Sequence, residues 1–178
     1  MPVSEALRVV LTEAQRIGAI GPSSLEHAIA HAMQFVACVP TGPIDLIDLG
    51  SGGGLPGLMI ADQRPECAVT LVDRRQSRVD QLTRAIRSLG WGDRVVALCE
   101  DMGAVAATRP RAFDVATGRG FGPPALTLQY AAACVRNGGS IIISEPPDDR
   151  PERWPSPLPD RIDGSERCGG VRVFHVKP

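Results

Sequence analysis

Five glycines lie within the ten residues "DLGSGGGLPG", at positions 48 to 57, directly after the apolar run "IDLI". Ordering a glycine costs more backbone entropy than ordering any other residue, so this density indicates a site where the backbone must approach another group closely. A phosphate or a nucleoside could be that group. The alternative is that the glycines only form a tight turn between a strand and a helix.

The spacing of these glycines fits a dinucleotide-binding fold. Gly52, Gly54 and Gly57 satisfy G-x-G-x-x-G, and Asp73 stands 19 residues beyond Gly54 at the end of the next apolar run. In such folds the glycines bring the backbone close to a pyrophosphate, and the acid accepts hydrogen bonds from ribose hydroxyls. The first pattern therefore favours a nucleotide cofactor.

The same loop also fits the D-x-G-x-G-x-G pattern of S-adenosylmethionine-dependent methyltransferases, through Asp48, Gly50, Gly52 and Gly54. Asp48 would repel a pyrophosphate, but it would attract the ammonium of S-adenosylmethionine, directly or through a water. Asp73 can accept from the ribose hydroxyls of either cofactor. Strand, glycines, helix, strand and acid follow in order, which favours a cofactor site over a simple turn.

The segments around this loop predict an α/β fold. Apolar runs at 44–49, 68–73, 95–99, 113–117 and 140–144 are typical of strands, and helical patterns fall between them at 55–65, 79–89 and 124–139. The strands are apolar on both faces, which indicates a mostly parallel, Rossmann-like sheet with helices on both faces. We expect the 124–139 helix to end at Asn137-Gly138.

The two ends of the chain complete the predicted architecture. Helical spacing from Val3 to Ile17, and a helix capped by Ser24, predict an N-terminal helical lead-in over 1–42, ahead of a core over 43–178 in the same domain. The proline-rich residues 146–160 are expected to form a surface loop. Residues 171–176 predict a last strand, paired with a segment near 161–163.

Net charge, cysteine content and the lengths of the apolar runs exclude some classes of protein but do not identify the function. The net charge of -1 is unlike a dedicated nucleic-acid binder, although six arginines and two aspartates give residues 74–94 a local basic character. Five cysteines without a C-x-x-C indicate reduced thiols in a cytoplasmic protein and no zinc site. We expect no metal, no membrane span, because no apolar run approaches about 20 residues, and no signal peptide.

Three stretches together carry a family resemblance. "DLGSGGGLPGL", "VTLVDRRQSRVDQL" and "FDVATGRG" resemble the RsmG (GidB) family of 16S ribosomal RNA guanine-N7 methyltransferases, from about residue 20 to the end. The resemblance implies a class I methyltransferase fold preceded by helices, making 1–178 a single methyltransferase domain. It implies S-adenosylmethionine as cofactor, S-adenosylhomocysteine as product, and ribosomal RNA or a small-subunit precursor as partner. The oligomeric state stays open.

The resemblance also assigns roles to individual residues. The glycine-rich loop would hold the methionine part of the cofactor, Asp73 with Arg74 beside it the ribose, and the segment after the third strand the adenine. Arg119, in "TGRG", would lie near both the cofactor and the target base and is the catalytic candidate; the alternative is a surface arginine in a loop, but loops at strand ends are where such folds place their chemistry. The predicted cofactor-binding residues are Asp48, Gly50, Ser51, Gly52, Gly53, Gly54, Asp73, Arg74, Glu100, Asp101, Met102 and Arg119.

The resemblance is less complete at the positions that the family is expected to use for RNA than at the positions expected to bind the cofactor. The family often has a lysine-arginine pair where this chain has Ser77-Arg78, and its H-x-x-D-S element is reduced to His27. A divergent enzyme acting on a small molecule, or an inactive cofactor-binding relative, therefore stay open as alternatives. The chain lacks the D/N-P-P-Y loop of amine methylation and the Pro-Cys of pyrimidine C5 methylation. Guanine N7 needs neither, because its lone pair is free.

Overall fold

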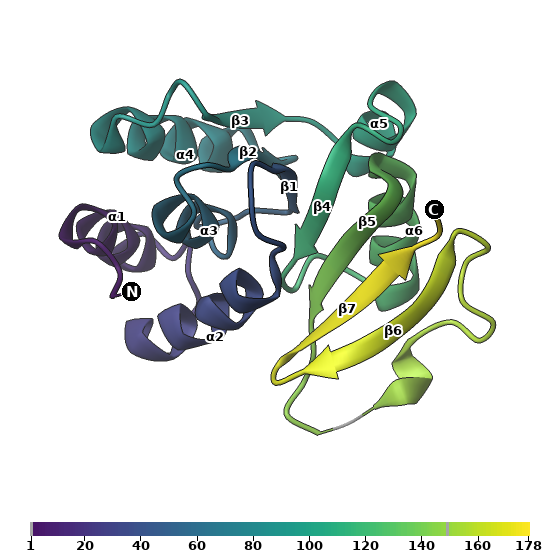
Figure 1. Cartoon of the computed structure of the whole chain (residues 1–178). Helices are drawn as coiled ribbons and strands as arrows, with labels where there is room; N and C mark the ends of the chain where they lie inside the picture. Colours follow the sequence, from purple (N-terminus) through teal and green to yellow (C-terminus); the bar gives the residue numbers. More distant parts are fainter. Residues whose placement is uncertain (1, 149) are drawn as a thin grey trace.

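A computed structural model describes residues 2–148 and 150–178, and within them seven strands form one sheet in the order β3-β2-β1-β4-β5-β7-β6 (Figure 1). The strands are β1 (Asp45–Leu49), β2 (Ala68–Asp73), β3 (Val95–Cys99), β4 (Phe113–Gly118), β5 (Val135–Ser144), β6 (Ile162–Cys168) and β7 (Val171–Val176). Strands β1 to β5 pair in parallel, whereas β7 is antiparallel to both β5 and β6. The parallel strands therefore bring their carboxyl ends to one edge of the sheet.

Helices cover both faces of the sheet, as the apolar strands require. They are α1 (Glu5–Arg16), α2 (Leu25–Cys38), α3 (Gly57–Gln63), α4 (Gln76–Leu89), α5 (Met102–Thr108) and α6 (Pro124–Cys134), with a short 3-10 turn η1 (Pro151–Arg153). The core on one face joins α1 to α4 to the sheet, and the core on the other joins α5, α6 and Trp154 to it. Adjacent strand residues divide between the two, with Leu46 in the first and Ile47 in the second, because side chains alternate along a strand.

The predicted fold class is confirmed, and several elements match closely. The strands predicted over 68–73, 95–99 and 171–176 have those bounds, and Ser24 caps α2 by accepting a hydrogen bond from the His27 N–H at 3.2 Å. Residues near 161–163 begin β6, which pairs with β7 as expected. Alternating apolar runs and an N-cap serine thus predicted the elements correctly where the signal was local.

The helix predicted over 124–139 is wrong in its second half. Helix α6 ends at Cys134, and β5 begins at Val135, which pairs with Phe113. Gly138 does have a positive φ of 75°, but it lies within a strand and donates its N–H to the Lys177 carbonyl at 3.1 Å. Gly138 therefore does adopt a left-handed backbone conformation, as a helix end would require, but it does so at an irregularity within strand β5.

Two features were absent from the sequence prediction. Helix α5 follows β3 directly, capped by Asp101. The proline-rich segment is mostly loop, but Trp154 within it is buried and packs edge-to-face on Phe174 with ring centroids 4.7 Å apart. The segment is therefore anchored to the sheet through one aromatic side chain.

Candidate functional site

A cavity of about 380 Å³ lies at the carboxyl ends of the parallel strands, and we call it the loop cavity. Such a position is where open α/β sheets bind their ligands, beside the point where the strand order reverses, here between β1 and β4. Its walls come from the glycine-rich loop, the ends of β2 and β3, the segment after β4, and α6. The lining residues are Gly50, 72–75, 100–102, 120–123, Leu126, Thr127 and Tyr130.

Gly50 brings the backbone of the loop to the edge of this cavity. Its φ is 67°, a left-handed value that favours glycine, and a Cβ at this position would come within 2.4 Å of the Phe121 ring. Gly53 faces the other way, since a Cβ there would come within 2.5 Å of Ile20 and 2.9 Å of the Ala19 carbonyl oxygen. The loop is thus held between Phe121 on one side and the N-terminal helical region on the other.

Ser51 fixes the loop to the neighbouring strand. Its N–H donates to the Val72 carbonyl at 2.9 Å, and its hydroxyl accepts from the Val72 N–H at 3.1 Å while donating to the Asp48 carbonyl at 2.9 Å. Ser51, Gly52, Gly53 and Gly54 are not lining residues of the loop cavity. The structure therefore places these four predicted residues behind the cavity wall, where they shape its backbone.

Asp48 lies fully buried beneath the loop and does not line the loop cavity. Its carboxylate accepts from the Thr117 hydroxyl at 2.7 Å and from the Gly57 N–H at 3.2 Å. Burial raises the pKa of Asp48 to about 6, although these hydrogen bonds and the charge of Arg119 act in the opposite direction. Asp48 can thus act on a bound cation only through space, while its oxygens hold β1, β4 and the start of α3 together.

Asp73 lines the loop cavity and is held in an ionised form. It accepts from the Gly52 N–H at 3.1 Å, and from the backbone N–H and side chain of Arg75 at 2.9 to 3.3 Å. Burial alone would raise the pKa of the Asp73 carboxyl, but the hydrogen bonds from Arg75 and Gly52 outweigh it and keep the pKa below its usual range. An ionised carboxylate at a strand end is a strong acceptor for ribose hydroxyls.

The segment after β3 supplies the far wall. The Glu100 carboxylate pairs with both terminal nitrogens of Arg109 at 2.7 and 2.9 Å, and Asp101 caps α5 by accepting from the Gly103 N–H at 2.8 Å. Met102 is buried with its side chain in the core. With their side chains so engaged, these residues leave backbone groups and apolar surface for a flat ring.

The structure adds residues that the sequence prediction missed. Phe121 lies three residues after the end of β4, and Leu126, Thr127 and Tyr130 lie on α6. A spacing of i, i+1 and i+4 on a helix behind the cavity could have indicated them, but the same spacing is typical of any buried helix face. These side chains complete the wall of the loop cavity, and Phe121 lies against Gly50 of the glycine-rich loop.

Arg119 lies outside the loop cavity, in a neighbouring hollow of about 460 Å³ that we call the arginine cavity. Gly120 lines both cavities, so the two adjoin at the residue that follows Arg119. Of the predicted site residues, the structure gathers Gly50, Asp73, Arg74, Glu100, Asp101 and Met102 around the loop cavity. Arg119 does not line that cavity, although Gly120, the next residue in the sequence, does.

The loop cavity suits an adenosine-type cofactor without a phosphate. Asp73 and the backbone of Gly50 line the cavity, Met102 and Phe121 offer apolar surface for a ring, and buried Asp48 adds negative charge beneath the loop. The carboxylates beside the glycines favour a cationic ligand and disfavour a pyrophosphate. The donor set therefore fits S-adenosylmethionine better than a dinucleotide.

Metal-binding clusters and membrane-spanning helices are both absent from residues 2–148 and 150–178. No group of three or more histidine, cysteine, aspartate or glutamate side chains there is arranged to hold a metal ion. No helix there combines the length and apolar character needed to cross a membrane.

Comparison with known proteins points to one family. The family model for "rRNA small subunit methyltransferase G" (GidB) matches residues 8–146. The ribosomal RNA small subunit methyltransferase G of Rhizorhabdus wittichii is 32% identical over 126 residues, covering 68% of this chain and 57% of the relative. The Rubrobacter xylanophilus protein of the same name is 30% identical over 145 residues, covering 78% and 55%.

These relatives are longer than this chain, which spans little more than half of their length. Among solved structures, a methyltransferase from Geobacter sulfurreducens superposes with a TM-score of 0.70 at 14% identity, covering 100% of this chain and 91% of the other. At that identity the likeness supports the fold alone.

Proposed function

The chain belongs to the rRNA small subunit methyltransferase G (GidB) family, and from this premise we propose that it is a cytoplasmic S-adenosylmethionine-dependent methyltransferase acting on guanine N7 of 16S ribosomal RNA. The observation that carries the proposal is the loop cavity, where the Gly50 backbone, ionised Asp73 and the 100–102 segment converge at the strand ends. The acceptor is inferred from the names of the relatives and from the family resemblance of the sequence.

Each part of the cavity has a proposed role in holding the cofactor. Asp73 accepts hydrogen bonds from the ribose hydroxyls, with Arg74 and Arg75 beside it. The 100–102 segment and Phe121 enclose the adenine, and the backbone around Gly50 receives the methionine part. Ser51 and Gly52 to Gly54 act as positioning residues, since they fix the loop to β2 and to the core.

Methyl transfer to guanine N7 requires little acid or base catalysis from the protein. When bound, the cofactor would supply an electrophilic methyl group, carried on its sulfonium, for transfer to N7. Guanine N7 has a free lone pair and needs no general base, so the main task is alignment and exclusion of water. Arg119, which is half-buried and lines the arginine cavity, is proposed to contact the acceptor.

The cofactor assignment is tested by calorimetry with S-adenosylmethionine on the whole chain. Asp73→Asn should weaken binding about 10-fold or more, because a hydrogen bond to a charged group contributes about 1.5–3 kcal/mol. Asp80→Asn is the matched control, since this exposed aspartate lies on α4 and outside the loop cavity. Absence of wild-type binding near about 1 mM ligand, or an unchanged affinity in the Asp73 variant, would contradict the assignment.

The acceptor is tested separately by mass spectrometry of ribosomal RNA from a strain lacking this gene. A single guanine N7 methyl group should disappear from the small-subunit RNA and return when the intact gene is restored. If the cofactor binds but every ribosomal methyl group persists in that strain, a small-molecule acceptor or an inactive relative becomes the better description.

A further inference from the structure

The arginine cavity is open to a ligand of nucleotide size beside the cofactor site. Its volume of about 460 Å³ lies within the range of small-molecule sites, about 300–1,000 Å³. Its walls come from the α1–α2 connection, α2, the ends of β4 and β5, and η1. The shared residue Gly120 places any occupant next to whatever fills the loop cavity.

Arg119 faces this cavity without a partner in the described chain. Within residues 2–148 and 150–178 its guanidinium makes no hydrogen bond or ion pair, although the side chain is half-buried. Burial lowers the pKa of Arg119, and the charge of Asp48 acts against this. Half-burying an unpaired guanidinium is unfavourable, so an anionic ligand would supply the missing partner.

Arg153 reaches the same cavity from the proline-rich segment, beyond residue 146, where the match to the family model ends. Its side chain is fixed by one nitrogen that donates to the Glu145 carboxylate at 3.0 Å, while the guanidinium stacks on the Trp154 ring at 5.0 Å. The remaining guanidinium nitrogens have no hydrogen bond among residues 2–148 and 150–178. Arg153 is therefore held in place with donors to spare.

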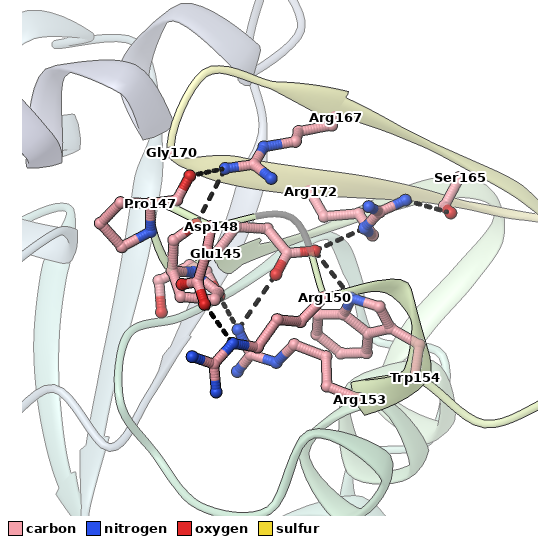
Figure 2. A network of polar contacts seen from close by, with 12 residues as sticks. Glu145, Pro147, Asp148, Arg150, Arg153, Trp154, Ser165, Arg167, Gly170 and Arg172 are labelled. Carbon is pink, nitrogen blue, oxygen red and sulfur yellow. Dashed lines mark hydrogen bonds and ion pairs between the residues drawn. The ribbon is translucent and has the colours of Figure 1, made fainter.

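Glu145 is the residue that holds the Arg153 side chain in place. Figure 2 shows its carboxylate between Arg153, Trp154 and Arg172, and it accepts from the Trp154 indole at 2.7 Å and from Arg172 at 2.5 Å. The Glu145 side chain is 1% exposed. Because its negative charge is shared among two arginines and an indole, it positions Arg153 without cancelling the positive charge of the cavity.

The other titratable group facing the cavity adds no negative charge. His31 donates a ring N–H to the Gly170 carbonyl at 3.2 Å, and burial lowers the pKa of His31, so it is neutral near pH 7. Arg119 and Arg153 thus outnumber Glu145, and Glu145 is further neutralised by Arg172. The cavity favours an anion with several acceptor oxygens.

We infer that the arginine cavity holds the acceptor nucleotide of the RNA, with Arg119 and Arg153 binding its phosphodiester from two separate segments. This rests on the proposed function. The phosphate is the fitting partner because guanidinium groups pair with phosphate oxygens in bidentate geometry, and because the base must keep N7 free for methyl transfer. Arg153 is thereby a specificity residue that residues 8–146 do not contain.

The experiment uses the full chain saturated with S-adenosylhomocysteine, titrated with guanosine 5′-monophosphate or guanosine. The chain has two tryptophans, and their indole N–H signals in a nitrogen-proton NMR spectrum report two places. Trp154 touches Arg153, whereas Trp91 stacks under Arg94 at 5.0 Å and lines neither cavity. The nucleotide should shift the Trp154 signal alone, and it should bind more tightly than guanosine.

Arg153→Ala should lower the affinity for the nucleotide ~10-fold while leaving that for guanosine unchanged, since only a phosphate contact is lost. Arg150→Ala is the matched control, because Arg150 lies in the same segment, is exposed and pairs with Asp148. In methyl transfer to small-subunit RNA, Arg153→Ala should raise KM with little change in kcat. Arg119→Ala removes no bond within the described protein and should independently weaken nucleotide binding.

The outcomes separate this inference from the proposed function. If the wild type does not bind S-adenosylhomocysteine, the proposed function fails before the acceptor is tested. If S-adenosylhomocysteine binds and RNA is methylated, but neither arginine variant alters the preference for nucleotide over guanosine, the inference alone is overturned. A nucleotide titration that shifts neither indole signal, or only that of Trp91, overturns it as well.

Discussion

Replacing Asp48 by asparagine should stabilise the protein at neutral pH and change how its stability depends on pH. The side chain is fully buried, and burial raises its pKa to about 6, from an ordinary value of 3.8. Asparagine has the same shape, can still accept from the Gly57 N–H, and carries no charge. The substitution therefore removes the cost of a buried charge and keeps much of the local geometry.

The size of the effect follows from linkage between protonation and folding. Each pKa unit corresponds to about 1.4 kcal/mol, so holding Asp48 ionised costs the fold about 3 kcal/mol at pH 7.5. Protonated Asp48 carries no such cost. The stability that the protonated form retains over the ionised form is therefore fully present below the unfolded pKa and is lost as pH rises through about 6. At pH 4.5 the cost is about 1 kcal/mol.

The measurement is urea unfolding of wild type and Asp48→Asn at pH 4.5 and pH 7.5, without cofactor. Between these values the wild type should lose about 2 kcal/mol relative to the variant. Asp45→Asn is the control, because it removes an exposed carboxylate from the same strand and leaves the buried one in place. Parallel stability curves for wild type and Asp48→Asn across this range would refute the reasoning.

Three other substitutions or reactions test the surroundings of the site. Gly53→Ala should destabilise the fold by about 1–3 kcal/mol in urea unfolding, because its Cβ would overlap the α1–α2 connection, whereas Gly21→Ala meets open space and should change little. Burial raises the pKa of Cys134 to about 11, so iodoacetamide at pH 8 should modify the exposed Cys99 and spare Cys134 in peptide mass spectrometry. Trp154→Phe should cost about 1–3 kcal/mol, because a buried carboxylate loses its indole donor.

The parallel half of the fold was predictable because its signals are local. Residues 68–73 and 95–99 are short apolar runs bounded by polar residues, and both are strands with those bounds. The glycine-rich loop and Asp73 also follow from spacing alone, since the carboxyl ends of adjacent parallel strands must meet. Six predicted site residues line the loop cavity for that reason.

The remaining features depend on contacts between distant residues. Nothing local in "AAACVRNGG" indicates that Val135 pairs with Phe113, so a helical pattern was extended through what is the start of β5. The burial of Trp154 requires the Glu145 carboxylate and the Phe174 ring, which lie 9 and 20 residues away in the sequence. Proline and charge dominate the composition of that segment and hide its one anchor.

The position of Asp48 shows why a correct motif can suggest an incomplete role. The pattern predicts an acid near a cationic cofactor, but both carboxylate oxygens are used by Thr117 and Gly57. Thr117 lies two residues before Arg119, so Asp48 links the loop cavity to the arginine cavity through β4. A cation in the loop cavity favours ionised Asp48, and ionised Asp48 in turn favours the charge of Arg119. The same buried charge that lowers stability therefore couples the electrostatics of the two cavities, which a hydrogen-bonded neutral residue at this position could not do.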